Sequence, residues 1–259
     1  MFNKLGLQIY SVRNYMTDAK SVRETFERLA KIGYSEVQTA GAFPCTVEEY
    51  ASAAHDNGFT FVGTHYGFPA DVNDIEDYVK MHQILGTTNA GVGGAFDMSK
   101  DKSKVIPFIE KANTLGENLK KYGMKFTYHH HAFEFAKLEG DRIMDMLVDG
   151  LNPETTSFVL DTHWLQKGGV SITEWLEKLA GRCDILHLKD YAVAPGDNNG
   201  YITECGSGNI NFKEVIKVAE QVGVKHLCVE QDTWPLGFDS VDYCMKKSFD
   251  HLSQYLDLK

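Results

Sequence analysis

DILHLKDY, residues 184–191, is one of four short apolar runs in the second half of this chain that each carry a side chain able to bind a metal. The others are YHHHAFEF (128–135), SFVLDTHW (157–164) and HLCVEQDTW (226–234), and the four side chains are Glu134, Asp161, His187 and Glu230. Runs rich in Val, Ile, Leu and Phe between turn residues are typical of buried strands in a parallel sheet. Because a carboxylate buried without a partner is unstable, we expect these strands to end together around a shared cation.

Each of these four side chains has a simpler explanation when it is taken alone. An Asp or Glu at the end of a strand commonly caps a helix or accepts a hydrogen bond in a loop. Independent caps, however, would not place metal-binding residue types in every one of the four runs. Three carboxylates and an imidazole suit a divalent ion such as Mn²⁺, Mg²⁺, Co²⁺ or Zn²⁺ better than a soft metal, and we predict one such ion per chain.

Glycine residues divide the chain into repeats of a helix and a strand. Six of them each follow an amphipathic segment and precede an apolar run, as expected where helices end: Gly33, Gly58, Gly86, Gly123, Gly181 and Gly223. Strands are expected at residues 5–12, 35–39, 59–65, 89–93, 125–131, 157–161, 184–189 and 226–231. Helices are expected at 21–32, 46–57, 74–85, 105–122, 141–149, 172–180, 211–222 and 241–256. Eight repeats of about thirty residues, with no linker rich in Pro or Ser, predict a (β/α)₈ TIM barrel in a single domain over residues 1–259.

In such a barrel the active site is formed by the loops that follow the strands, where the candidate ligands lie. The longest of these connections, residues 192–208, is interpreted as a mobile lid, although its GSG segment also fits a simple turn before the next helix. Further candidate substrate-binding residues at strand ends are Gln8, His65, His129, His131, Trp164 and Lys189. Aromatic packing is the alternative for Trp164, and a salt bridge to Asp161 or Asp190 is the alternative for Lys189.

The composition excludes several classes of partner. With 26 basic and 36 acidic residues the formal charge is -10, and no basic patch is present, which argues against binding to nucleic acid or an anionic membrane. Five cysteines without CxxC spacing fit a reducing cytoplasm. The N-terminus lacks the features of a signal peptide, and no run is long and apolar enough to span a bilayer. The oligomeric state stays open, a homo-oligomer included.

The segments LQIYSVR (7–13), YHHHAFEF, LDTHW (160–164), HLKD (187–190) and VEQD (229–232) together resemble the xylose isomerase-like TIM barrels. The resemblance spans essentially the whole chain and points to the sugar phosphate isomerase/epimerase branch. Inosose dehydratases, ketose 3-epimerases and AP endonucleases are related to this branch. The resemblance implies one divalent metal held by Glu, Asp, His and Glu, which map here to Glu134, Asp161, His187 and Glu230.

The chain departs from the ketose 3-epimerase pattern in two places. Those enzymes place a metal-binding Glu early on the fifth strand and a second Glu six residues later, whereas this chain has Tyr128 early and Glu134 late. Either Glu134 binds the metal, or it contacts the substrate and a histidine binds the metal instead. Trp164 also occupies the place of a substrate-contacting histidine. The histidine-rich zinc cluster of AP endonucleases has no counterpart after HLKD, so DNA repair is not expected.

The resemblance and the ligand set together predict a metal-dependent sugar isomerase or epimerase. The substrate would be a small sugar or cyclitol with a carbonyl group, and the reaction would pass through an enediolate. Glu230 and Glu134 are the expected base and acid, and a histidine of the HHH run, His130 first, is the substitute base if the metal fully occupies Glu134. Residues 130 and 134 share a face in an unbroken strand, whereas a bend at Ala132 would reverse this. The alternatives are an inosose- or keto-sugar dehydratase and a non-catalytic carbohydrate-binding barrel.

Overall fold

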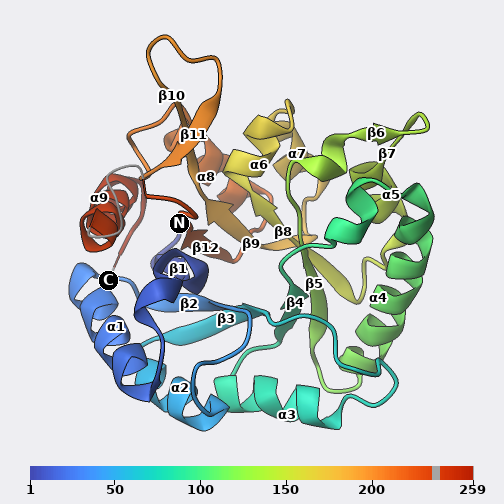
Figure 1. Ribbon diagram of the computed structural model, residues 1–259, viewed down its shortest axis with the longest axis horizontal. Coiled ribbons are helices and arrows are strands. Elements are labelled where there is room, and N and C mark those ends of the chain that lie inside the picture. The colour runs from blue at the N-terminus through green and yellow to red at the C-terminus, as the bar shows by residue number, and fades with distance from the viewer. Residues whose placement is uncertain (235–239, 259) are drawn as a thin grey trace.

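The computed structural model describes residues 1–234 and 240–258, and its centre is an eight-stranded parallel sheet surrounded by helices (Figure 1). The strands are β1 (Gly6–Gln8), β2 (Glu36–Ala40), β3 (Thr60–His65), β4 (Asn89–Val92), β5 (Lys125–His129), β8 (Thr156–Asp161), β9 (Cys183–Leu188) and β12 (His226–Val229). They are hydrogen bonded in the order β3-β2-β1-β12-β9-β8-β5-β4. The eight expected strands and the TIM barrel are therefore confirmed.

Helices cover the outside of the sheet and connect its strands. They are α1 (Ala19–Ile32), α2 (Val47–His55), α3 (Glu76–Leu85), α4 (Val105–Lys120), α5 (Ile143–Gly150), α6 (Thr162–Lys167), α7 (Ile172–Lys178), α8 (Phe212–Gln221) and α9 (Val241–Leu252). The six glycines expected at helix ends all have positive φ, which a residue with a side chain rarely adopts. Each helix buries one apolar face; in α1 this face carries Val22, Phe26 and Leu29.

The barrel is closed between β3 and β4 by contacts other than a regular ladder. Among the described residues these two strands form no ladder, but the Gly91 N–H donates to Thr64 Oγ1 (3.2 Å) and Asn89 Nδ2 donates to the Val62 carbonyl (2.9 Å). The backbones approach closely here, since a Cβ on Gly91 would lie 2.6 Å from the Thr64 carbonyl oxygen. Glycine is required at this position because no larger residue fits between the strands.

Two expected strands end earlier than the sequence pattern predicts. The first strand stops at Gln8, and a 3₁₀ helix, η1 (Ile9–Tyr15), begins there because the Gln8 side chain accepts from the Tyr10 N–H (3.1 Å). The fifth strand stops at His129 because the His131 N–H donates to Glu134 Oε2 (2.8 Å), which turns the chain into η4 (Phe133–Phe135). The expectation of an unbroken strand through residue 131 is therefore wrong.

Two further elements were not expected. Helix α6 follows β8 directly, because Asp161 Oδ1 accepts from the Trp164 N–H (3.0 Å) and so caps the helix. The connection at residues 192–208 contains most of an antiparallel hairpin, β10 (Asp190–Val193) with β11 (Gly200–Thr203). Figure 1 shows this hairpin extending beyond the barrel at the top of the view.

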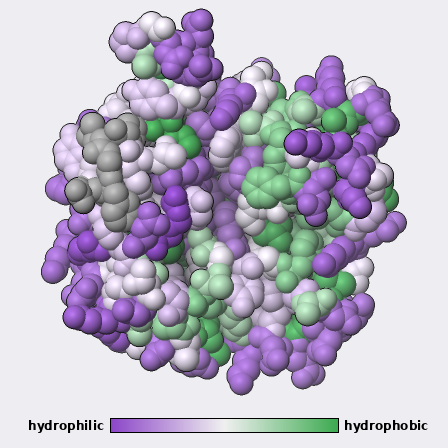
Figure 2. Space-filling model, viewed as in Figure 1, coloured by the Kyte–Doolittle hydropathy of each residue, from purple (hydrophilic) through white to green (hydrophobic). Residues whose placement is uncertain are grey.

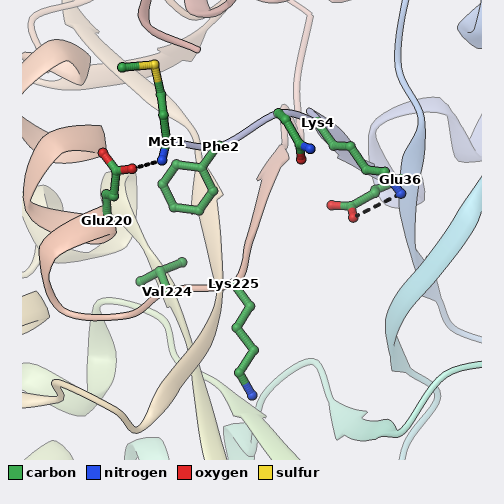
Figure 3. A pocket seen from close by; sticks show the side chains of 8 residues that line it. Met1, Phe2, Lys4, Glu36, Glu220, Val224 and Lys225 are labelled. Carbon is green, nitrogen blue, oxygen red and sulfur yellow. Dashed lines mark ion pairs between the residues drawn. The ribbon is translucent and has the colours of Figure 1, made fainter. Parts of the chain in front are cut away.

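The amino ends of the strands carry ion pairs around a shallow hollow (Figure 3). The amino group of Met1 pairs with Glu220, and Lys4 with Glu36 (4.0 Å). This end of a TIM barrel contributes to stability, whereas the opposite end carries the active site in known enzymes. In the described parts of the chain, no helix combines the length and the apolar character needed to cross a membrane.

Candidate metal centre

Four buried side chains converge at the carboxyl ends of neighbouring strands. His129 ends β5, Asp161 ends β8, His187 lies near the end of β9, and Glu230 follows β12. One nitrogen or oxygen atom from each lies within 4.8 Å of those from the other three. These strands are adjacent in the sheet, and Asp161 is directly opposite His187 in the ladder. The group can hold a divalent metal ion.

The atoms that face one another in this group lack hydrogen bonds within the described chain, although ion-pair contacts join several of them. His129 Nε2, Asp161 Oδ2, His187 Nδ1 and Glu230 Oε2 are buried without a hydrogen bond to any described residue. His187 Nδ1 lies 2.9 Å from Glu230 Oε2 and 3.7 Å from Asp161 Oδ2. Buried polar atoms without a hydrogen bond are costly, and these four are the donor types that divalent ions bind. The residues present therefore fit the expected ion.

Hydrogen bonds on the outer side of both histidines leave their inner nitrogens free to bind a cation. His187 Nε2 lies 2.5 Å from Gln38 Oε1, and His129 Nδ1 lies 3.2 Å from the Gly93 carbonyl oxygen. Because both partners accept, each of these ring nitrogens carries the proton. Gln38 is itself held by Gln8, whose Nε2 donates to Gln38 Oε1 (2.9 Å). A hydrogen bond from the ring nitrogen that faces away from the metal is typical of metal-binding histidines.

Lys189 compensates for much of the negative charge of the site. Its Nζ forms ion pairs with Asp161 (3.0 Å) and Glu230 (2.9 Å) and donates to Asp232 Oδ2 (3.1 Å). Burial alone would raise the pKa of Glu230, but Lys189 and His187 outweigh it and lower this pKa far below its usual range. Burial and the nearby Glu230 raise the pKa of Asp232 to about 6. Of the alternatives for Lys189, the ion pair with Asp161 is present.

A cavity of about 310 Å³ opens beside this group. It is lined by Tyr10, Ala40, Gly41, His65, Gly93, Phe96, His129, His131, Lys189, Glu230 and Asp232. Figure 2 shows hydrophilic residues near the centre of this face of the molecule, with hydrophobic residues beside them. Burial lowers the pKa of His131 to about 2 and lowers that of His65 strongly, so both rings are neutral at neutral pH.

Four of the six expected substrate-binding residues line this cavity, namely His65, His129, His131 and Lys189. Gln8 lies behind it and donates from Nε2 to His65 Nδ1 (3.1 Å), which directs the proton on His65 to Nε2. Trp164 also lies outside the lining, where its ring contacts that of His131, with 5.1 Å between the centroids.

The structure does not bring Glu134 and His130 to the cavity or into the metal-binding group. Glu134 Oε1 accepts from the Tyr128 hydroxyl (2.7 Å) and Oε2 from the His131 N–H, so both carboxylate oxygens are used. Burial raises the pKa of Glu134 to about 7. His130 Nδ1 donates to the His131 carbonyl (3.0 Å), and its Nε2 accepts from the Asp161 N–H (3.1 Å). His129 joins Asp161, His187 and Glu230 in place of Glu134.

Sequence reasoning missed two residues of the site, Gln38 and Asp232. Gln38 is a fully buried amide in the middle of β2 (EVQTA), and a polar side chain inside an expected strand is a signal that the sequence does contain. Asp232 lies two residues beyond Glu230 in the segment VEQD. Its approach to Lys189 depends on the tertiary structure, and nothing in the local pattern predicts it.

The chain belongs to the xylose isomerase-like TIM barrel family, whose model matches residues 26–243. Among curated proteins it is similar to an inosose dehydratase from Geobacillus thermodenitrificans, with 26% identity over 152 residues. That match covers 53% of this chain and 50% of the dehydratase, so the chain spans about half the length of the curated relatives it matches.

Solved structures share the complete fold. A sugar phosphate isomerase/epimerase from Parabacteroides distasonis superposes with a TM-score of 0.83 at 22% identity, covering 100% of this chain and 96% of that one. A xylose isomerase-like barrel from Mycobacterium smegmatis, in complex with magnesium, superposes with a TM-score of 0.70 at 15% identity, covering 99% of both chains. At these identities the likeness establishes the barrel, and the chemistry has to be argued from this chain's own residues.

Proposed function

We propose that this barrel is a divalent-metal-dependent sugar isomerase or epimerase acting on a small polyhydroxylated carbonyl compound. The observation that carries the proposal is the convergence of four ligand atoms that lack a hydrogen bond to any described residue, beside a cavity of about 310 Å³. The cavity is at the small end of the range for ligand pockets, which suits a single sugar or cyclitol ring. The family and the isomerase/epimerase fold relative support the same class.

In this proposal His129, Asp161, His187 and Glu230 hold one divalent ion. A bound ion would polarise the carbonyl and an adjacent hydroxyl of the substrate and so make the neighbouring C–H bond more acidic. Mn²⁺, Mg²⁺, Co²⁺ and Zn²⁺ all accept such a donor set. Glu134 has a supporting role, since its carboxylate fixes the backbone of His131 at the edge of the cavity.

In this proposal three other lining residues, His65, Asp232 and Phe96, bind and orient the substrate together with Glu230. His65 presents a protonated Nε2 that has no hydrogen bond to a described residue and can donate to a substrate oxygen. Glu230 and Asp232 both line the cavity and are the carboxylates that can accept a proton from the substrate carbon. Phe96, whose side chain is exposed at the cavity, offers an apolar surface for the C–H face of a sugar.

The test is exchange of substrate hydrogen with solvent. The protein is loaded with Mn²⁺ and incubated in D₂O with ketoses, 3-keto sugars and inososes. Mn²⁺ is then removed with a chelator, and the products are followed by NMR. Deuterium next to the carbonyl, with an unchanged oxygen count, is the expected result, and a Glu230→Gln variant should lose turnover by orders of magnitude. Turnover without deuterium incorporation would contradict a carboxylate base that exchanges its proton with solvent and would indicate a hydride shift or a shielded proton relay, while leaving the metal site intact.

Dehydration is the second candidate, and the inosose dehydratases among the curated relatives are the observation in its favour. An enediolate that expels a β-hydroxyl group loses water, so the same site residues serve either reaction. The D₂O experiment separates the two, because exchange with loss of water identifies the lyase. A carbohydrate-binding barrel without activity would give neither product nor exchange.

A further inference from the structure

Lys189 places a buried ammonium group against the candidate metal centre. The side chain is 1% exposed, and Nζ lies 3.0 Å from Asp161 Oδ2 and 2.9 Å from Glu230 Oε2. The ring of Trp164 lies over another side of the ammonium, 5.1 Å from Nζ. Three carboxylates, those of Asp161, Glu230 and Asp232, lie within 3.1 Å of Nζ and stabilise its charged form, so the group is an ammonium in this structure.

The two carboxylate oxygens in contact with Lys189 are also the ones that face the histidine ligands. His187 Nδ1 lies near both Asp161 Oδ2 and Glu230 Oε2, and His129 Nε2 lies 3.6 Å from Asp161 Oδ2. A metal bound by the histidines therefore uses the same two oxygens as the ammonium. Two cations that draw on the same oxygens oppose each other, and the opposition is strong where water does not screen it.

The net charge of the cluster also shows that Lys189 weakens metal binding. With His129 and His187 neutral, as metal ligands have to be, Asp161, Glu230 and Asp232 contribute three negative charges and Lys189 one positive charge, which leaves -2 and would be balanced by one divalent ion. Without Lys189 the cluster would carry -3. Lys189 therefore reduces the attraction of the cluster for a metal while it stabilises the three buried carboxylates.

Lys189 is held at its backbone and at its ammonium group. Its backbone is fixed on both sides by Thr162, whose hydroxyl donates to the Lys189 carbonyl (2.8 Å) and accepts from its N–H (2.9 Å). At the other end, Nζ lies 2.9 Å from Glu230, 3.0 Å from Asp161 and 3.1 Å from Asp232, so three carboxylates share the ammonium. Asp232 is not one of the four converging residues, so it can retain the ammonium when a metal takes the other two carboxylates.

We propose that Lys189 is an internal cation that competes with the divalent metal for Asp161 and Glu230, and so sets the metal affinity of the site and stabilises the protein without metal. This inference rests on the proposed metal centre. It makes Lys189 a positioning residue of the carboxylates, with a role distinct from contact with the substrate.

The test compares Mn²⁺ binding to wild type, Lys189→Met and Lys178→Met by isothermal titration calorimetry after removal of metal with EDTA. Lys178 is a matched control, because it is a half-exposed lysine on α7 that pairs with Asp145 (2.6 Å) away from the cavity. We expect Lys189→Met to lower the dissociation constant for Mn²⁺ at least about tenfold and the control to leave it unchanged.

Thermal unfolding gives a readout independent of activity. In EDTA, Lys189→Met should melt at a lower temperature than the control, and Mn²⁺ should raise its Tm by more than it raises that of wild type. If Lys189→Met does not fold in EDTA, Lys189→Gln, which keeps a donor for Asp232, is titrated instead with the same expectation. An unchanged or weaker affinity in the variant that folds would overturn the competition.

The outcomes also separate this inference from the proposed function. Wild type that binds no Mn²⁺, together with a Lys189 variant that does bind it, would show that the lysine blocks the site, and would count against the proposed metal-dependent activity alone. Failure of both proteins to bind Mn²⁺ would overturn both proposals. Tight binding to wild type with no gain in the variant would overturn the role of Lys189 only.

Discussion

His129 and Glu134 are five residues apart, and only His129 has an atom that could bind a metal without first losing a hydrogen bond. The inner nitrogen of His129 has no hydrogen bond to a described residue, whereas both oxygens of Glu134 have partners. We therefore expect Asp161→Asn and His129→Ala to lose the metal and Glu134→Gln to retain it, because only the first two remove a ligand. Elemental analysis after dialysis against Mn²⁺ measures the metal content.

Two results would contradict this assignment of ligands. Full metal content in both Asp161→Asn and His129→Ala would mean that the ion binds elsewhere. Loss of metal from a folded Glu134→Gln protein would return Glu134 to the ligand set, as the resemblance to the family first implied. Circular dichroism of each variant serves as the control for folding.

Glu134 also makes stability depend on pH. Its pKa is raised from 4.5 to about 7 by burial, so the folded protein favours the protonated form. This contribution is fully present below pH 4.5 and is lost as the pH rises through 7, a change of about 3 kcal/mol. Urea unfolding of wild type and Glu134→Gln in EDTA should show the advantage of wild type shrinking over this range. Parallel stability curves for the two proteins would contradict the raised pKa.

At the scale of elements, the β10–β11 hairpin depends on Asp190 at its base. The carboxylate of Asp190 accepts from four backbone N–H groups, those of Tyr191, Gly206, Gly208 and Ile210. Gly208 lies so close that a Cβ there would be 2.3 Å from Asp190 Oδ1. The carboxylate thus fixes both the start of the hairpin and the chain that leaves it.

Asp190→Ala should loosen this connection, because four buried or partly buried N–H groups lose their acceptor. Removing such an acceptor costs about 1–3 kcal/mol. Hydrogen exchange read by mass spectrometry should become faster in peptides from residues 190–210, while peptides from α1 exchange as before. Unchanged exchange in the hairpin would show that other contacts hold it.

The sequence predicts these elements well where their signal is local. Glycines at helix ends and apolar periodicity correctly indicate eight strands and the barrel. The end of β5 and the start of α6 were missed because each depends on one side chain, Glu134 or Asp161, accepting from a backbone N–H three residues away. An acidic residue near a strand end therefore has to be tested as a cap before it is assigned as a ligand.

At the scale of the whole molecule, closure of the barrel requires Gly91. A Cβ at this position would lie 2.1 Å from Thr127 Oγ1 and 2.6 Å from the Thr64 carbonyl oxygen, so alanine would force β3 away from β4. We expect Gly91→Ala to destabilise the protein by about 1–3 kcal/mol or more, measured by urea unfolding in EDTA. Gly93→Ala is the matched control, since its nearest neighbour is 3.4 Å away. Equal losses in the two variants would contradict close packing at this junction.

The junction between β3 and β4 and the four candidate ligands lie in different parts of the barrel. The ligands are carried by β5, β8, β9 and β12, which form an uninterrupted series of ladders, while β3 is outside that series. The contacts that join β3 and β4 directly include two hydrogen bonds that use side chains, so local opening at this junction breaks no regular ladder among the described residues. If β3 and β4 separate, the ladders between β5, β8, β9 and β12 remain, so a metal held by these strands would keep all four of its ligands while the neighbouring β3–β4 seam opens.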